Sequence, residues 1–291
     1  MIAPPAYEIE PEALRAFLDR KVAEYNRPSF IPEDPVSIPH AYSLRQDIEI
    51  AGFFAAIFSW GNRTTIIRKS AELMQLMDRS PHQFILHHTD KELKKLLAFK
   101  HRTFNTTDLL YFIEFLRHHY TRYDSLEDAF LLGSPIYDHG GVSQASHGTS
   151  PTSRTGLPLL VSAAPSRFLS LAAFHHYFFS LEAVPPRTRK HIATPERNSS
   201  CKRLNMFLRW MVRKDDKGVD FGLWDRILPG QLICPLDLHV ARVAKRFGLL
   251  TRKPTDWPAA LELTRNLALL DPEDPVKYDF ALFGLGVMEK F

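Results

Sequence analysis

The chain has 291 residues, of which 45% are hydrophobic and 24% charged, and this composition excludes collagen-like, coiled-coil and fully disordered proteins. Its only two cysteines, Cys201 and Cys234, exclude a disulfide framework and an iron–sulfur cluster held by four thiolates of this chain, and they indicate a reducing compartment. The first residues lack the features of a signal peptide, and the longest apolar run, residues 50–60, is too short to cross a bilayer. We therefore expect a cytoplasmic protein with no membrane partner.

The net charge of +4 is unevenly distributed along the chain. Residues 187–253 contain sixteen Lys and Arg against six Asp and Glu, a local net charge of +10, so the rest of the chain is acidic. Such a basic segment is typical of proteins that bind a polyanion such as nucleic acid. A solvated basic face without a partner gives the same count, and this alternative stays open.

Apolar residues recur with the period of an α-helix along nearly the whole chain. In the first part of the chain we expect helices over residues 11–25, 47–60, 63–77, 81–87, 90–98, 108–120 and 125–132. Gly61 is suited to end the second of these, and Asn62 to cap the third. No convincing alternation typical of a strand is found, so the sequence predicts an all-α fold.

Residues 134–165 differ from the rest in being rich in Gly, Ser, Thr, Pro and His without a sustained period. They offer too little apolar surface to offset the entropy of ordering them, so we expect a flexible insertion or linker. It separates an N-terminal helical part, residues 1–133, from a C-terminal helical part, residues 166–291. In the second part we expect helices over residues 166–181, 201–213, 237–247, 256–270 and 275–287.

The helix expected over residues 201–213 has two contrasting faces, with Ser199 and Ser200 as candidate N-caps. Its apolar face, typical of a core, comprises Leu204, Phe207, Leu208 and Met211, and its polar face comprises Lys202, Asn205, Arg209 and Arg213. Lys202 lies in the first turn, where the positive end of the helix dipole disfavours a protonated amine. An unprotonated amine is a nucleophile, although a solvated surface lysine is the plainer interpretation.

The segment Pro235-Leu236-Asp237-Leu238-His239-Val240, followed by Arg242, resembles the aspartate signature of the helix-hairpin-helix DNA glycosylase superfamily. There the signature reads Val-Asp-Thr-His-Val ahead of an Arg, and the aspartate lies at the start of a helix beside the target sugar. The Gly-Leu-Leu of residues 248–250 resembles the usual sequel. The alternative is that Asp237 only caps its helix, a common role for Asp.

The position of the lysine distinguishes two branches of this superfamily. Ordinary members carry it just after a hairpin of the type Leu-Pro-Gly-Val-Gly, whereas Leu228-Pro229-Gly230 is followed here by no second glycine and by no lysine before Asp237. The archaeal 8-oxoguanine DNA glycosylase branch takes its lysine from an earlier helix, and Lys202 lies 35 residues before Asp237. The resemblance is therefore closest to that branch.

The resemblance implies one glycosylase-like unit of two helical lobes with a cleft between them. It implies a base-excision glycosylase with lyase activity, in which Lys202 attacks the sugar of an oxidised purine nucleotide and Asp237 stabilises the developing charge. No cofactor is implied. The residues expected to contact DNA are Asn62, Arg63, Arg203, Arg209, His239 and Arg242. A glycosylase-like fold that binds nucleic acid without catalysis is the alternative, a helical interaction protein with only a basic face is a third hypothesis, and RNA in place of DNA stays open.

Two further patterns complete the prediction. The run from Phe58 to Thr64 is similar to the glycosylase segment Leu-Ser-x-Gln-x-Thr, whose glutamine fills the gap left by a flipped base, and this gives Asn62 or Arg63 that role; a break between two helices is an equal alternative. The C-terminal region, including residues 271–284, also resembles an uncharacterised bacterial family catalogued only as a domain of unknown function.

Three pairs of adjacent histidines invite a metal interpretation: His87-His88, His118-His119 and His175-His176. Neighbouring residues on a helix diverge by about 100°, so one pair does not converge on an ion by itself. Two cysteines are also too few for a zinc site. The sequence therefore predicts no metal.

Overall fold

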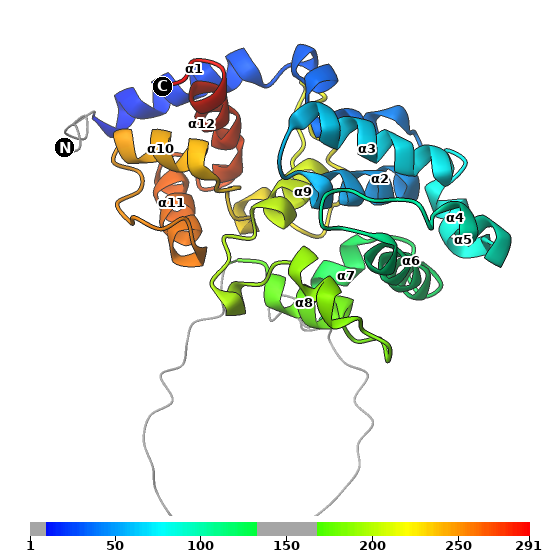
Figure 1. Ribbon diagram of the computed structural model, residues 1–291. Helices are drawn as coiled ribbons and strands as arrows, with labels where there is room; N and C mark the ends of the chain where they lie inside the picture. The colour runs from blue at the N-terminus through cyan, green and yellow to red at the C-terminus, as the bar shows by residue number, and fades with distance from the viewer. Residues whose placement is uncertain (1–9, 133–167) are drawn as a thin grey trace, which may run out of the picture.

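The computed structural model describes residues 10–132 and 168–291, and within these ranges the fold is built from α-helices and short 3-10 helices, with no β-strand (Figure 1). The all-α prediction is confirmed. The α-helices are α1 (Pro11–Tyr25), α2 (Arg45–Phe58), α3 (Arg63–Leu76), α4 (Pro81–His87), α5 (Asp90–Lys95), α6 (Thr106–Tyr120), α7 (Glu127–Leu131), α8 (Leu171–Phe178), α9 (Lys202–Val212), α10 (Leu238–Arg246), α11 (Trp257–Leu270) and α12 (Tyr278–Val287). The insertion predicted over residues 134–165 lies outside the described residues.

The helices gather in two groups, with α9 between them (Figure 1). One group contains α1, α10, α11 and α12, and α12 packs against both α1 and α10. The other contains α2 to α8, and α2 packs against α9. Helices from the predicted N-terminal part thus contact helices from the predicted C-terminal part. None of the described helices combines the length and the apolar character that a membrane span needs.

Helix α2 is the centre of the core, because every residue from Asp47 to Phe58 is buried. Its Phe53 ring packs against Phe207 of α9 at a centroid distance of 5.5 Å. The two helices approach closely at Gly52, where a Cβ atom would lie 3.2 Å from Met211 Cε. The apolar face predicted for residues 201–213 is therefore confirmed as core, and it fixes the orientation of α9.

Helix starts follow the sequence in most places. The predicted cap at Asn62 is confirmed, since its side chain accepts a hydrogen bond from Thr65 N at 3.0 Å. The caps predicted for α9 are wrong: Cys201 is the N-cap residue, with a left-handed φ of 52°, and no side chain caps the helix. Ser199 Oγ instead accepts a hydrogen bond from Cys201 N, which tightens the turn before the helix.

The buried carboxylate of Glu49, on α2, is hydrogen-bonded to several separate segments of the fold. It accepts hydrogen bonds from Tyr120 Oη at 2.8 Å, Ser125 Oγ at 2.6 Å, Leu126 N at 2.9 Å and Trp224 Nε1 at 2.7 Å. Four donors from three separate segments therefore depend on one side chain.

We expect Glu49→Gln to lower the free energy of unfolding by about 1 to 3 kcal/mol, because the amide turns one acceptor into a donor that faces other buried donors. Urea unfolding measures the change. Glu114→Gln, on the exposed side of α6, is the matched control and should change stability by less than about 0.5 kcal/mol. Equal effects of the two substitutions would contradict the role given to Glu49.

A second buried group makes stability depend on pH. His119 of α6 is fully buried; its ring nitrogens contact Tyr177 Oη and Ser125 O, and burial lowers the pKa of the imidazole. As the pH falls below about 6.5, the unfolded chain takes up a proton here while the folded protein does not. The unfolded state then binds more protons, so the free energy of unfolding falls as the pH falls.

We therefore expect His119→Gln to flatten this dependence, by up to about 1.4 kcal/mol per pH unit below the ordinary histidine pKa. Urea unfolding of both proteins at about pH 7.5 and about pH 5.5 measures it. The same loss of stability in both proteins on acidification would overturn the assignment.

Candidate active site

The first residues of two helices bring a lysine and an aspartate together. Lys202 is the first residue of α9, and Asp237 is the N-cap residue of α10. Asp237 Oδ1 accepts hydrogen bonds from His239 N and Val240 N, both at 2.9 Å, so Asp237 does cap its helix. The other carboxylate oxygen, Oδ2, lies 3.7 Å from Lys202 Nζ. Capping therefore occupies one oxygen and leaves the second to face the amine.

Both side chains remain within reach of solvent, since 26% of the Lys202 side chain and 24% of the Asp237 side chain are exposed. Their backbones are held firmly. Ser200 Oγ donates a hydrogen bond to Leu236 O, at 3.2 Å, which links the segment before α9 to the segment before α10. The pair is thus fixed by two helix starts and open on one side.

A small cavity of about 30 Å³ lies beside the pair. It is lined by Phe30, Asp34, Lys202, Met206, Arg209, Trp210, Pro235, Asp237, Val240, Asp279 and Phe283. This volume suits a water molecule or two and is too small for a nucleobase. Phe30 and Phe283, both partly exposed, pack edge to face with ring centroids 6.3 Å apart.

The side chain of Arg63, the first residue of α3, also lies near this cavity. Its guanidinium carbon lies 5.5 Å from the centre of the Phe283 ring. Its charge also helps to lower the pKa of Asp34 in the cavity, against the dominant effect of burial, which raises that pKa. The structure therefore brings Arg63 close to the cavity beside Lys202 and Asp237.

Two further carboxyl groups in the cavity, Asp34 and Asp279, were not identified from the sequence. Burial raises the pKa of Asp279 to about 6, although the nearby Arg209 favours its ionised form. Asp279 is also ion-paired with the buried Arg209. The site thus combines an amine, the capping carboxylate and a second, buried carboxyl group.

On the polar face of α9, Asn205, Arg209 and Arg213 are all buried. The Arg209 guanidinium contacts Asp220, at 3.3 Å, and Asp279. Its partners come from a loop and from α12, which enclose this side of α9. Arg209 is therefore not available on the surface for a phosphate, and the prediction that it contacts DNA fails on burial.

The other residues expected at a DNA interface have different surroundings. Arg203 donates hydrogen bonds to the backbone oxygens of Ile57 and His191, and burial lowers its pKa to about 10. Arg242 is exposed, but its guanidinium donates to the backbone oxygens of Gly286 and Phe291.

Two further predicted contact residues also lie at the surface. Asn62 is exposed, and its side-chain oxygen caps α3. His239 is exposed in the first turn of α10, two residues after Asp237. Among the residues proposed to contact DNA, Arg209 lines the cavity and Arg63 lies close to it. In the chain, Arg203 directly follows Lys202, and His239 lies two residues after Asp237.

Each cysteine lies just before one member of the pair, Cys201 before Lys202 and Cys234 before Asp237, but neither is suited to nucleophilic chemistry. Both are buried and free. Burial raises the pKa of Cys201 to about 12 and that of Cys234 well above its usual value. A thiol rather than a thiolate is therefore present at neutral pH, so neither cysteine offers this site a nucleophile.

A larger cavity, of about 610 Å³, lies elsewhere, along α3 and the 3-10 helices η2 (Pro35–Ser37) and η3 (Pro39–Ala41). Its lining includes Tyr42, Arg68 and Arg79 but no lysine, cysteine or histidine. Arg68 is paired with Glu72 of the same helix, at 3.9 Å. This cavity is the larger of the two, but the small cavity beside Lys202 has the side chains that are better suited to catalysis.

A family model described as Protein of unknown function (DUF2400) matches residues 34–288 of the chain. No curated protein and no solved structure shows significant similarity to it. The matched residues include Asp34, Lys202, Asp237 and Asp279.

Proposed function

This chain belongs to the family described as Protein of unknown function (DUF2400), and we propose that it is a DNA base-excision glycosylase with associated lyase activity. The observation that carries the proposal is the distance of 3.7 Å between Lys202 Nζ and Asp237 Oδ2 at the starts of two helices. The lysine–aspartate order and the signature around Asp237 resemble the archaeal 8-oxoguanine DNA glycosylase branch, and an oxidised purine is the substrate proposed on that ground.

The chemistry needs an amine and a carboxylate together. After the Lys202 ammonium group loses a proton to water, the lone pair of Nζ forms a bond to C1′ of the damaged nucleotide. The glycosidic C–N bond breaks as the base leaves with the bonding electrons and takes up a proton. The Asp237 carboxylate stabilises the positive charge that develops on the sugar. Loss of a proton from Nζ and opening of the sugar ring then give a Schiff base, from which elimination cleaves the strand on the 3′ side.

The surroundings of the pair support binding of a sugar-phosphate chain. The N-termini of α9 and α10 both point to this place, and helix N-termini favour anions. Arg63 adds a positive charge near Phe283. A damaged base must leave the stack to react, and the exposed edges of Phe30 and Phe283 offer aromatic surface against which it can pack once these side chains move apart.

The size of the cavity favours a second candidate, a glycosylase-like protein that binds nucleic acid without catalysis, because about 30 Å³ leaves no room for a base unless the aromatic side chains rearrange. The two candidates differ in covalent chemistry and agree in salt-dependent DNA binding.

A panel of end-labelled duplexes separates them, each carrying one lesion: 8-oxoguanine, uracil or a preformed abasic site, with an undamaged duplex as control. We expect strand cleavage at 8-oxoguanine and at the abasic site and none in the undamaged duplex. Binding that weakens with salt but is accompanied by no cleavage of any duplex would favour the non-catalytic protein and contradict the glycosylase.

A further inference from the structure

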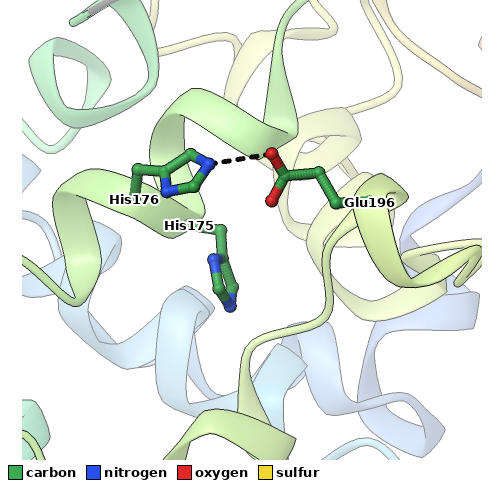
Figure 2. Close-up of side chains that lie close together, drawn as sticks. All are labelled: His175, His176 and Glu196. Carbon is green, nitrogen blue, oxygen red and sulfur yellow. Dashed lines mark hydrogen bonds and ion pairs between the residues drawn. The ribbon is translucent and has the colours of Figure 1, made fainter.

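We propose that His175, His176 and Glu196 form a binding site for a divalent ion of the zinc class, separate from the lysine–aspartate site. The two histidines lie on α8, and Glu196 lies on the 3-10 helix η5 (Pro195–Arg197). Each offers one ligand atom, and these atoms all lie within 4.8 Å of one another. Figure 2 shows the three side chains close together, with a hydrogen bond between His176 and Glu196.

The spacing is close to that of a metal site. Zinc binds His nitrogen and carboxylate oxygen at about 2.0 to 2.2 Å in a tetrahedron, which places ligand atoms roughly 3.4 Å apart. His176 Nε2 and Glu196 Oε1 already lie 2.9 Å apart. The three ligand atoms, all within 4.8 Å of one another, therefore lie near the separation that a single ion requires.

His175 gives independent support, because it is a buried polar side chain without a partner. Only 5% of the residue is exposed, and neither ring nitrogen has a hydrogen-bond partner among the described residues. In contrast, both ring nitrogens of His119, which is also buried, have hydrogen-bond partners. A buried imidazole without partners costs free energy, and coordination of an ion by one nitrogen would remove part of that cost.

The other two ligands leave a path for the ion. The side chains of His176 and Glu196 are 66% and 50% exposed, so an ion can enter from solvent and keep a water molecule as its fourth ligand. Two imidazoles and a carboxylate suit zinc better than the harder calcium or magnesium ions. Arg189 lies over Phe179, which itself contacts His175, so this nearby positive charge opposes the binding of a cation.

Bound metal would connect α8 to the segment that leads into α9. Glu196 precedes Lys202 by six residues, so the ion would hold this approach to the helix in place. We therefore infer an ion that stabilises this segment, and the inference does not depend on the proposed glycosylase activity.

The test is calorimetric titration of the full chain, freed of metal with a chelator, with zinc chloride alone. We expect saturable binding of one ion per chain and an increase in melting temperature on binding. His176→Ala and Glu196→Gln should each weaken binding by about tenfold or more. Both positions are exposed, so folding should survive, and melting temperatures without metal verify this.

The matched control is His87→Ala, which removes an exposed histidine that is likewise followed by a second histidine, and it should leave zinc binding unchanged. Absence of saturable binding to the wild-type chain would overturn the inference. Binding by His176→Ala as tight as that of the wild type would overturn it equally.

Discussion

Lys202→Gln is expected to abolish both strand cleavage and covalent trapping of a lesion-bearing duplex by borohydride. Gln keeps most of the length and the polarity of the side chain but has no lone pair on an amine nitrogen, so no Schiff base can form. The side chain is part-exposed at the first position of α9, and the apolar face of the helix is untouched, so the fold should persist. DNA affinity should fall only by the contribution of one charge.

Lys190→Gln is the control for that charge. Lys190 is exposed and belongs to the same basic segment, so its replacement removes an equal charge without touching the cavity. It should weaken DNA binding slightly and leave trapping intact. Cleavage by Lys202→Gln at the rate of the wild type would show that the nucleophile lies elsewhere.

Asp237→Asn is expected to slow base release by about 10² to 10³, which corresponds to about 3 to 4 kcal/mol of transition-state stabilisation. Asn caps a helix as well as Asp does, so the hydrogen bonds to His239 N and Val240 N can persist. What the substitution removes is the negative charge of Oδ2, the oxygen that faces Lys202 Nζ. Single-turnover cleavage of the 8-oxoguanine duplex measures the effect.

Asp256→Asn is a control with the same local chemistry. Asp256 caps α11 by accepting a hydrogen bond from Ala259 N at 3.1 Å, and it pairs with Arg252 at 2.7 Å, but it does not line the cavity. Its replacement should not change the cleavage rate. If Asp237→Asn also cleaves as fast as the wild type at an unchanged melting temperature, Asp237 is a helix cap and nothing more.

The sequence predicts the helices well because most of them carry an apolar stripe, and half of the described α-helices begin with a side chain that caps them. It predicts the faces of α9 less well. Arg209 and Arg213 look exposed on a helical wheel, yet both are buried, because Asp220, Asp274 and Asp279 meet them from segments that follow α9 in the chain. A periodic pattern identifies polar residues, but it does not show whether another element brings countercharges to cover them.

Contacts between segments distant in the chain also explain why the sequence did not reveal the other residues of the site. Lys202 and Asp237 each lie at the start of a helix, and the resemblance to one glycosylase branch links them in the sequence. Asp34 reaches the cavity from a 3-10 segment without periodicity, and Asp279 comes from α12. His175 and His176 gain their third partner, Glu196, from a separate short helix, a contact that spacing along one helix cannot reveal.

The most direct test of the central claim is to locate the covalent bond itself. The wild-type chain is incubated with a duplex that carries 8-oxoguanine, reduced with borohydride, digested, and analysed by mass spectrometry. The account predicts a sugar adduct on the fragment that contains Lys202, and on Nζ of that residue. An adduct on any other lysine, or strand cleavage without a trapped adduct, would contradict it.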